Sequence, residues 1–180
     1  MTDIVVTTFY HFTHFDDPKA MREPLFAEFS AANLRGTVLL ANEGVNGTLA
    51  GSREDINTAI TTLRALPNSA QLEYTESPAK SMPFYRLRVR LKGEIVTMGL
   101  PGVDPLERVG TYVVPSDWNN LIAEPETFVI DTRNNFEVEM GTFKGAINPR
   151  TSKFSDFPRW LEAHHAKFEN KKVAMFCTGG

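Results

Sequence analysis

The only cysteine of the chain, Cys177, stands directly before a threonine and two glycines. The preceding apolar run, residues 173–176, is typical of a buried strand, and ligands of open α/β sheets bind beyond the carboxyl ends of the strands. Successive glycines let backbone N–H groups turn inward and surround an anion, which would hold the thiol as the nucleophilic thiolate. The alternative is a structural cysteine, because a free cysteine also behaves as a small hydrophobic side chain.

A second group of residues suited to chemistry follows another apolar run, at residues 127–130. Asp131 and Arg133 come at the end of this predicted strand, and Glu137 follows shortly after them. Carboxylate and guanidinium groups so spaced can build a charge network beneath a neighbouring loop. Taken alone, these residues favour the simpler interpretation of an ion-pair cluster that holds loops in place.

Together the two motifs resemble the rhodanese homology domain. Residues 131–146 match its D-x-R-x-x-x-E-x-x-x-G-x-x-x-G-A pattern position by position, and Cys177 falls where that family carries its persulfide-forming cysteine. The stretch 142–144 departs from the pattern, since many rhodaneses have a histidine and an apolar residue there. The resemblance implies that Cys177 is catalytic. Three residues would order the loop around it and tune its charge: Asp131, Arg133 and Glu137.

Four stretches in the family's order narrow the resemblance to the bacterial tRNA uridine hydroxylases, the TrhO family. They are residues 36–51, 82–99, 131–149 and 171–180. Proteins of this family join an N-terminal ferredoxin-like (acylphosphatase-like) domain to a rhodanese domain. The resemblance implies oxygen-dependent hydroxylation of the wobble uridine, position 34 of certain tRNAs, to 5-hydroxyuridine. Molecular oxygen is then a co-substrate, the anticodon region of tRNA is the partner, and a sulfur or electron donor is a further partner.

Three other functions stay open. A sulfurtransferase would carry a persulfide on the same cysteine, so the local motif does not separate it from a hydroxylase, whereas an RNA-facing N-terminal sheet favours the hydroxylase. A non-enzymatic adaptor that binds tRNA or protein has no need of Cys177. A phosphatase of the related cysteine-loop type needs a longer loop.

In the resembled family the loop continues beyond CTGG with an arginine and a second cysteine. We therefore expect a fragment of a longer protein, with an incomplete active loop and little activity of its own.

The periodicity of apolar residues predicts the elements that must position these groups. Residues 1–97 follow a β-α-β-β-α-β order, which is that of the ferredoxin-like split β-α-β motif. Strands are expected at residues 4–13, 36–41, 48–51, 71–76 and 85–96, and helices at 17–33 and 52–66. Asp17 and Ser52 are suitable helix caps. The polar, glycine-rich residues 42–47 are either a substrate-facing loop or simply a turn, and turn chemistry favours the latter.

Residues 98–113 contain prolines and glycines without periodicity and are expected to form a linker. Residues 114–180 then give a short helix capped by Ser116, a strand at 127–133, a helix at 157–169 and a strand at 171–177. Continuous apolar strands alternating with helices predict a parallel α/β sheet. The expected fold class is thus an α+β ferredoxin-like domain followed by an α/β rhodanese-like domain that is incomplete at its C-terminus.

Basic residues gather locally although the net charge of the chain is −3. Arg86, Arg88 and Arg90 alternate with apolar residues, which places them on one face of a predicted strand. Such a stripe could follow a phosphate backbone, and Tyr85 could stack on a base. The alternative is a solvated sheet face. Five residues are therefore candidates for contact with RNA or another anion: Arg86, Arg88, Arg90, Lys144 and Arg150.

The composition of the chain limits the classes of protein and the cofactors to be expected. One cysteine cannot form an internal disulfide, the first residues lack the features of a signal peptide, and no apolar run is long enough to span a bilayer. We expect a soluble cytoplasmic protein without a membrane partner. The four histidines form no metal signature, and no G-x-G-x-x-G fingerprint indicates a flavin. The sequence therefore shows no metal or flavin that would activate oxygen.

Overall fold

The computed structural model describes residues 4–100, 106–107 and 110–178 of the chain. These residues divide into two compact units. Unit 1 contains residues 4–96 with 106–107, and unit 2 contains 97–100 with 110–178. Each unit has a hydrophobic core of its own.

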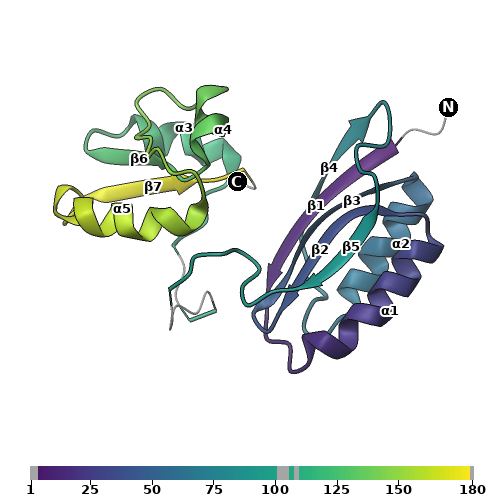
Figure 1. The fold of residues 1–180 in the computed structure, drawn as a ribbon. Coiled ribbons are helices and arrows are strands. Elements are labelled where there is room, and N and C mark those ends of the chain that lie inside the picture. The colour runs from purple at the N-terminus through teal and green to yellow at the C-terminus, as the bar shows by residue number, and fades with distance from the viewer. Residues whose placement is uncertain (1–3, 101–105, 108–109, 179–180) are drawn as a thin grey trace. The chain divides into compact units, whose positions relative to one another are not determined.

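Unit 1 is a five-stranded sheet with two helices on one face (Figure 1). Its strands lie in the order β4-β1-β3-β2-β5. They are β1 (Ile4–Phe12), β2 (Arg35–Ala41), β3 (Gly44–Gly51), β4 (Tyr74–Ala79) and β5 (Leu87–Leu91). The first four strands pair antiparallel, and β5 pairs parallel to β2 as an added edge strand. The predicted ferredoxin-like α+β fold is confirmed.

The two helices of unit 1 begin at the predicted caps. The Asp17 carboxylate accepts a hydrogen bond from the Ala20 N–H at the start of α1 (Pro18–Ala31). Ser52 and Asp55 form a reciprocal capping box at the start of α2 (Arg53–Arg64). Such caps satisfy backbone N–H groups that have no partner within the helix, and each contributes about 1 kcal/mol. Both helices therefore have a defined starting point on the sheet.

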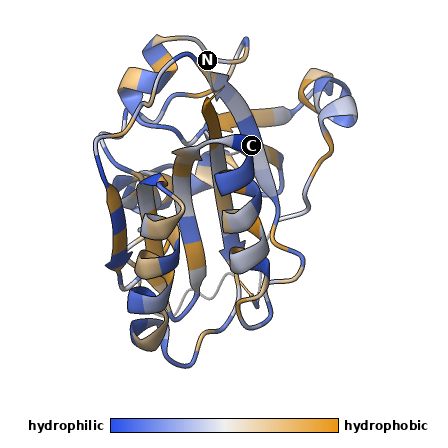
Figure 2. Ribbon diagram, turned by 90° about the vertical axis from the view of Figure 1, so that its right-hand side faces the viewer, coloured by the Kyte–Doolittle hydropathy of each residue, from blue (hydrophilic) through white to orange (hydrophobic). Residues whose placement is uncertain are grey.

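The core of unit 1 lies between the sheet and these helices, which lie side by side in Figure 2. Leu25 and Phe29 of α1 and three residues of α2 (Ile56, Ile60 and Leu63) are buried. Removing such side chains from water stabilises the fold by about 1.5–3 kcal/mol each. Phe26 of α1 stays outside the core, with its side chain 41% exposed, although helical spacing from Met21, Leu25 and Phe29 predicts it on the same apolar face. Phe26 is turned by about 100° from Leu25 around the helix, outside the row that meets the sheet.

Several strand limits differ from the prediction. β3 begins at Gly44 rather than at residue 48, because these earlier residues pair with both β1 and β2. The hairpin turn is consequently short, with only Asn42 and Glu43 between the strands. Strand β4 starts three residues later than predicted, and β5 is shorter than its apolar alternation suggested. Pairing partners, which local periodicity does not specify, set these limits.

The polar stretch at this hairpin holds neighbouring segments in place. The Glu43 carboxylate accepts a hydrogen bond of 2.6 Å from the Ile95 N–H, and the Asn46 amide donates one of 2.7 Å to the Ile95 carbonyl. The Asn42 amide donates to the Phe15 carbonyl over 3.0 Å. These contacts satisfy backbone groups that would otherwise be poorly hydrated. They support the interpretation of this stretch as turn chemistry.

Unit 2 contains the two parallel strands β6 (Thr127–Asp131) and β7 (Lys172–Phe176), with a further parallel bridge between Ile130 and Ile147. Its helices are α3 (Pro115–Ala123), α4 (Asn135–Glu139) and α5 (Phe157–His164), and short 3₁₀ turns cover Phe154–Asp156 and His165–Lys167. The core is built around Ile130, Phe157 and Phe168. The predicted order of strand, helix and parallel strand is present.

The start of α3 differs from the prediction. The sequence makes Ser116 the cap, but the helix begins at Pro115, and Val114 precedes it as a cap without a side-chain bond. The fixed φ of proline suits the first helical position, so the helix starts one residue earlier. None of the helices in the described ranges is long and apolar enough to cross a membrane.

The close packing of the β2–β3 hairpin against β1 predicts that Gly44→Ala destabilises unit 1. Gly44 has a φ of +135°, and an added Cβ would lie 2.0 Å from the His11 carbonyl oxygen. We expect the free energy of unfolding, measured in urea, to fall by about 2 kcal/mol or more. Gly93→Ala is the matched control, because a Cβ there meets nothing within 4 Å. Equal stability of the two variants would contradict this prediction.

Candidate functional site

The site lies at the carboxyl edge of the two parallel strands of unit 2. Asp131, the last residue of β6, pairs with Phe176, the last residue of β7, so the residues after both strands emerge together. The N–H and hydroxyl of Thr132 both donate to the Phe176 carbonyl, over 3.0 and 2.9 Å. These two bonds hold the backbone directly before Cys177 against the end of β6.

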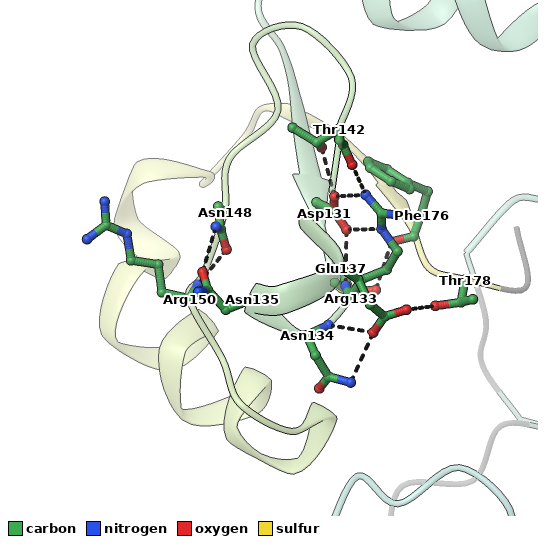
Figure 3. A network of polar contacts seen from close by, with 12 residues as sticks. Asp131, Arg133, Asn134, Asn135, Glu137, Thr142, Asn148, Arg150, Phe176 and Thr178 are labelled. Carbon is green, nitrogen blue, oxygen red and sulfur yellow. Dashed lines mark hydrogen bonds and ion pairs between the residues drawn. The ribbon is translucent and has the colours of Figure 1, made fainter. Parts of the chain in front are cut away.

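A buried ion pair anchors this edge (Figure 3). The guanidinium of Arg133 donates to both oxygens of the Asp131 carboxylate, over 2.9 and 2.7 Å. The Arg133 N–H and the Thr142 hydroxyl complete the carboxylate's partners, over 3.1 and 2.7 Å. Arg133 also donates to the Gly141 carbonyl over 2.6 Å. Asp131, which is fully buried, therefore connects β6 to the loop at residues 141–142.

The hydrogen bonds decide the charge of the pair. Burial by itself would raise the pKa of Asp131, but the bonds from Arg133 and Thr142 outweigh it and hold this pKa below its usual range. The hydrogen bond to Asp131 raises the pKa of Arg133 in turn, against a smaller opposing effect of burial. Both groups are therefore charged at neutral pH, and they neutralise each other. The geometry is that of the predicted ion-pair cluster.

Glu137 holds the other side of the loop. One oxygen of its carboxylate accepts the N–H and the side-chain amide of Asn134, over 3.1 and 3.0 Å, at the start of α4. The other oxygen accepts the Thr178 hydroxyl over 2.5 Å. Figure 3 shows Thr178 reaching this carboxylate. Because Thr178 directly follows Cys177, Glu137 fixes the path of the chain on the far side of the thiol.

Cys177 is exposed and borders an open cavity of about 410 Å³. The other lining residues are Arg133, Gly141, Thr142, Phe143, Phe176 and Thr178. The rings of Phe143 and Phe176 meet edge to face with centroids 5.0 Å apart, and Trp118 packs against both. The Arg133 guanidinium lies 5.4 Å from the centre of the Phe176 ring. A thiol beside aromatic side chains and a guanidinium suits a flat ring that carries polar substituents.

The structure brings four predicted site residues together: Cys177, Asp131, Arg133 and Glu137. It does not bring Arg150 to them, because in Figure 3 its side chain extends away from the Asp131–Arg133 pair. Lys144 is exposed and does not line the cavity.

The sequence alone does not predict five further residues of the site. They are Thr142, Thr178, Phe143, Phe176 and Trp118. Thr142 stands in the stretch that departs from the rhodanese pattern, and its hydroxyl bonds Asp131. Within the described part of the chain, no three histidine, cysteine, aspartate or glutamate residues lie close enough to hold a metal ion.

The fold and the site together define a two-part protein. It has an α+β unit of ferredoxin-like topology and a parallel α/β unit with an exposed cysteine at the carboxyl edge of its strands. Residues 4–95 match the family described as UPF0176 acylphosphatase like domain, and the chain belongs to this family.

Curated relatives carry the name tRNA uridine(34) hydroxylase. The relative from Jannaschia sp. is 53% identical over 98% of this chain and 58% of its own length. The relative from Mesorhizobium japonicum is 54% identical over 97% of this chain and 57% of its own length. The chain thus spans under two thirds of the length of these relatives. An acylphosphatase structure from Coxiella burnetii is 18% identical, with a TM-score of 0.35, over 49% of this chain and 92% of its own.

The buried ion pair predicts an acid-sensitive stability. The lowered pKa of Asp131 means that its charged form stabilises the fold above the ordinary pKa of about 4. This contribution is lost as the pH falls through the lowered pKa of the folded state. Asp131→Asn removes the charge that compensates Arg133, so we expect the free energy of unfolding to fall by about 3 kcal/mol at pH 7.

The difference between Asp131→Asn and the wild type should shrink as the pH falls through the acid range, as urea unfolding at a series of pH values would show. Glu162→Gln, at an exposed position on α5 of the same unit, is the control and should change stability by less than about 0.5 kcal/mol. A difference in the free energy of unfolding that stays constant at all pH values would contradict the lowered pKa of Asp131.

Proposed function

We propose that the protein hydroxylates the wobble uridine, position 34 of tRNA, to 5-hydroxyuridine, with Cys177 as its catalytic residue. One observation carries the proposal. Relatives named tRNA uridine(34) hydroxylase are 51–54% identical to this chain over 97–98% of its length. The geometry supports it, because an exposed thiol beside an aromatic-walled cavity can meet a nucleobase. A tRNA substrate places the reaction in the cytoplasm.

We further assign unit 2 to the rhodanese-like α/β class. Three features support this assignment: the residue pattern at 131–146, the parallel pairing of β6 with β7, and the position of Cys177 just beyond the end of β7. On this assignment Asp131, Arg133 and Glu137 are positioning residues. Their contacts with each other, with Thr142 and with Thr178 form the scaffold that orients the thiol.

The reaction has a defined balance. The hydrogen on C5 of uracil is replaced by a hydroxyl, one oxygen atom of O₂ enters the product, and the other leaves as water. Two electrons and two protons must come from a donor, so the proposal includes a reductant as a further partner. Cys177 would act as a thiolate nucleophile or carry a persulfide, and both roles require a thiol that is accessible from solvent.

A sulfurtransferase is the second candidate, because an exposed cysteine beside an open cavity would equally serve a persulfide. The two candidates differ in their product. A hydroxylase changes C5 of the wobble uridine, whereas a sulfurtransferase changes the amount of thiolated nucleosides or of persulfide on an acceptor.

Mass spectrometry of nucleosides from bulk tRNA tests the proposal. We would compare cells lacking the gene with cells complemented by the complete protein or by its Cys177→Ser variant. We expect 5-hydroxyuridine and its derivatives to vanish on deletion and to return only with the cysteine intact. Unchanged 5-hydroxyuridine together with a loss of thiolated nucleosides would replace the proposal by the sulfurtransferase. No change in either class would favour a binding adaptor.

The bond between Thr178 and Glu137 predicts a positioning effect. Thr178→Val removes the hydroxyl that fixes the chain beside Cys177, so we expect 5-hydroxyuridine formation to fall about tenfold to hundredfold. Thr178→Ser keeps the hydroxyl and should restore activity. Thr178 is exposed, so both variants should unfold within about 0.5 kcal/mol of the wild type. Full activity of the valine variant would show that this bond does not position the thiol.

A further inference from the structure

One face of the sheet in unit 1 is not covered by its helices. Both α1 and α2 pack on the opposite face, as Figures 1 and 2 show. Strand register places a row of side chains across the uncovered face. Thr8 of β1 lies opposite Thr48 of β3, Thr48 lies opposite Thr37 of β2, and Thr37 lies opposite Arg88 of β5. The row is therefore three hydroxyls followed by a guanidinium, and the Thr8 and Thr48 hydroxyls are 3.2 Å apart.

Further arginines gather at the β5 edge of this row. Arg90 of β5 lies on the same strand face as Arg88, because side chains two residues apart point the same way. Arg86 directly precedes the first residue of β5 on the other side of Arg88. The positive charge of Arg86, then partial burial, then the charge of Arg90 lower the pKa of Arg88. Gly36 of β2 pairs with Leu87 of β5, and the two strands are parallel. Arg35, which precedes Gly36, therefore lies beside Arg86, which precedes Leu87. These four arginines and the three threonines are called the arginine–threonine face.

Nothing acidic offsets these charges on the strands. Among the described strand residues of unit 1, the only carboxylate is Glu76 of β4, and it pairs with Arg53 of α2 over 2.8 Å on the helix-covered face. Like charges held close together cost free energy. The chain as a whole has a net charge of −3, so the cluster is a local departure from its average. Such a surface is complementary to a polyanion.

We propose that the arginine–threonine face binds the sugar–phosphate backbone of RNA. Neighbouring strands lie about 4.8 Å apart, so the face from β1 to β5 extends about 14 Å and can meet more than one phosphate. Guanidinium groups bind phosphate oxygens in a bidentate manner, and hydroxyl groups bind phosphate or ribose oxygens. Contacts of this kind read no sequence and hold the RNA in place. The identification of this RNA as tRNA rests on the proposed function.

The test is binding of a fluorescently labelled tRNA transcript to the full chain, measured by anisotropy at several salt concentrations. Arg35→Gln/Arg88→Gln should weaken binding about tenfold or more and reduce the slope of log K against log salt by about two. Lys19→Gln/Arg53→Gln is the matched control, because it removes the same charge from the helices of unit 1 and should change affinity much less.

Arg35→Lys/Arg88→Lys keeps the charge and should recover most of the lost affinity and of the salt slope, which separates a charge effect from a folding defect. The inference would be overturned if Arg35→Gln/Arg88→Gln bound tRNA with the affinity and salt slope of the wild type. It would also be overturned if the wild type bound no RNA. This readout is independent of the nucleoside analysis. If 5-hydroxyuridine proves unrelated to the gene, the proposed function fails while RNA binding by this face can still be measured.

Discussion

The geometry of the cysteine site depends on one buried carboxylate. Asp131 ends β6 in register with Phe176, and its charge is satisfied by Arg133 and Thr142. A buried charge without such partners would cost several kcal/mol, so the loop at residues 141–142 must stay where it can supply them. Because Phe176 directly precedes Cys177, the same register places the thiol beside the anchored loop.

The sheet of unit 1 shows a different division of roles between its two faces. One face is apolar and packs against α1 and α2, which contributes the core of the unit. The other face has hydroxyl groups across its centre and arginines at one edge. A period of two along each strand is sufficient to separate these faces, since neighbouring side chains point in opposite directions. The residues that stabilise unit 1 and the residues proposed to bind RNA are thus different residues of the same strands.

On the proposed function, the two units offer complementary properties. Unit 2 supplies an exposed thiol, an aromatic wall and a neutralised ion pair, which suit chemistry on a base. Unit 1 supplies positive charge without sequence readout, which suits the retention of a large polyanion. Binding energy from parts of a substrate that do not react can orient the reacting part, so on this proposal the open cavity of unit 2 need not hold tRNA by itself.

The sequence by itself determined the order of the elements, the caps at Asp17 and Ser52, and the position of Cys177 after an apolar strand. These features follow from local periodicity and from hydrogen bonds between near neighbours. Only the tertiary structure decided which strands pair and which distant side chains meet. Thr178 contacts Glu137 across 41 residues, and Arg35 lies beside Arg86 through the β2–β5 pairing. Such contacts depend on chain topology, which a local pattern does not encode.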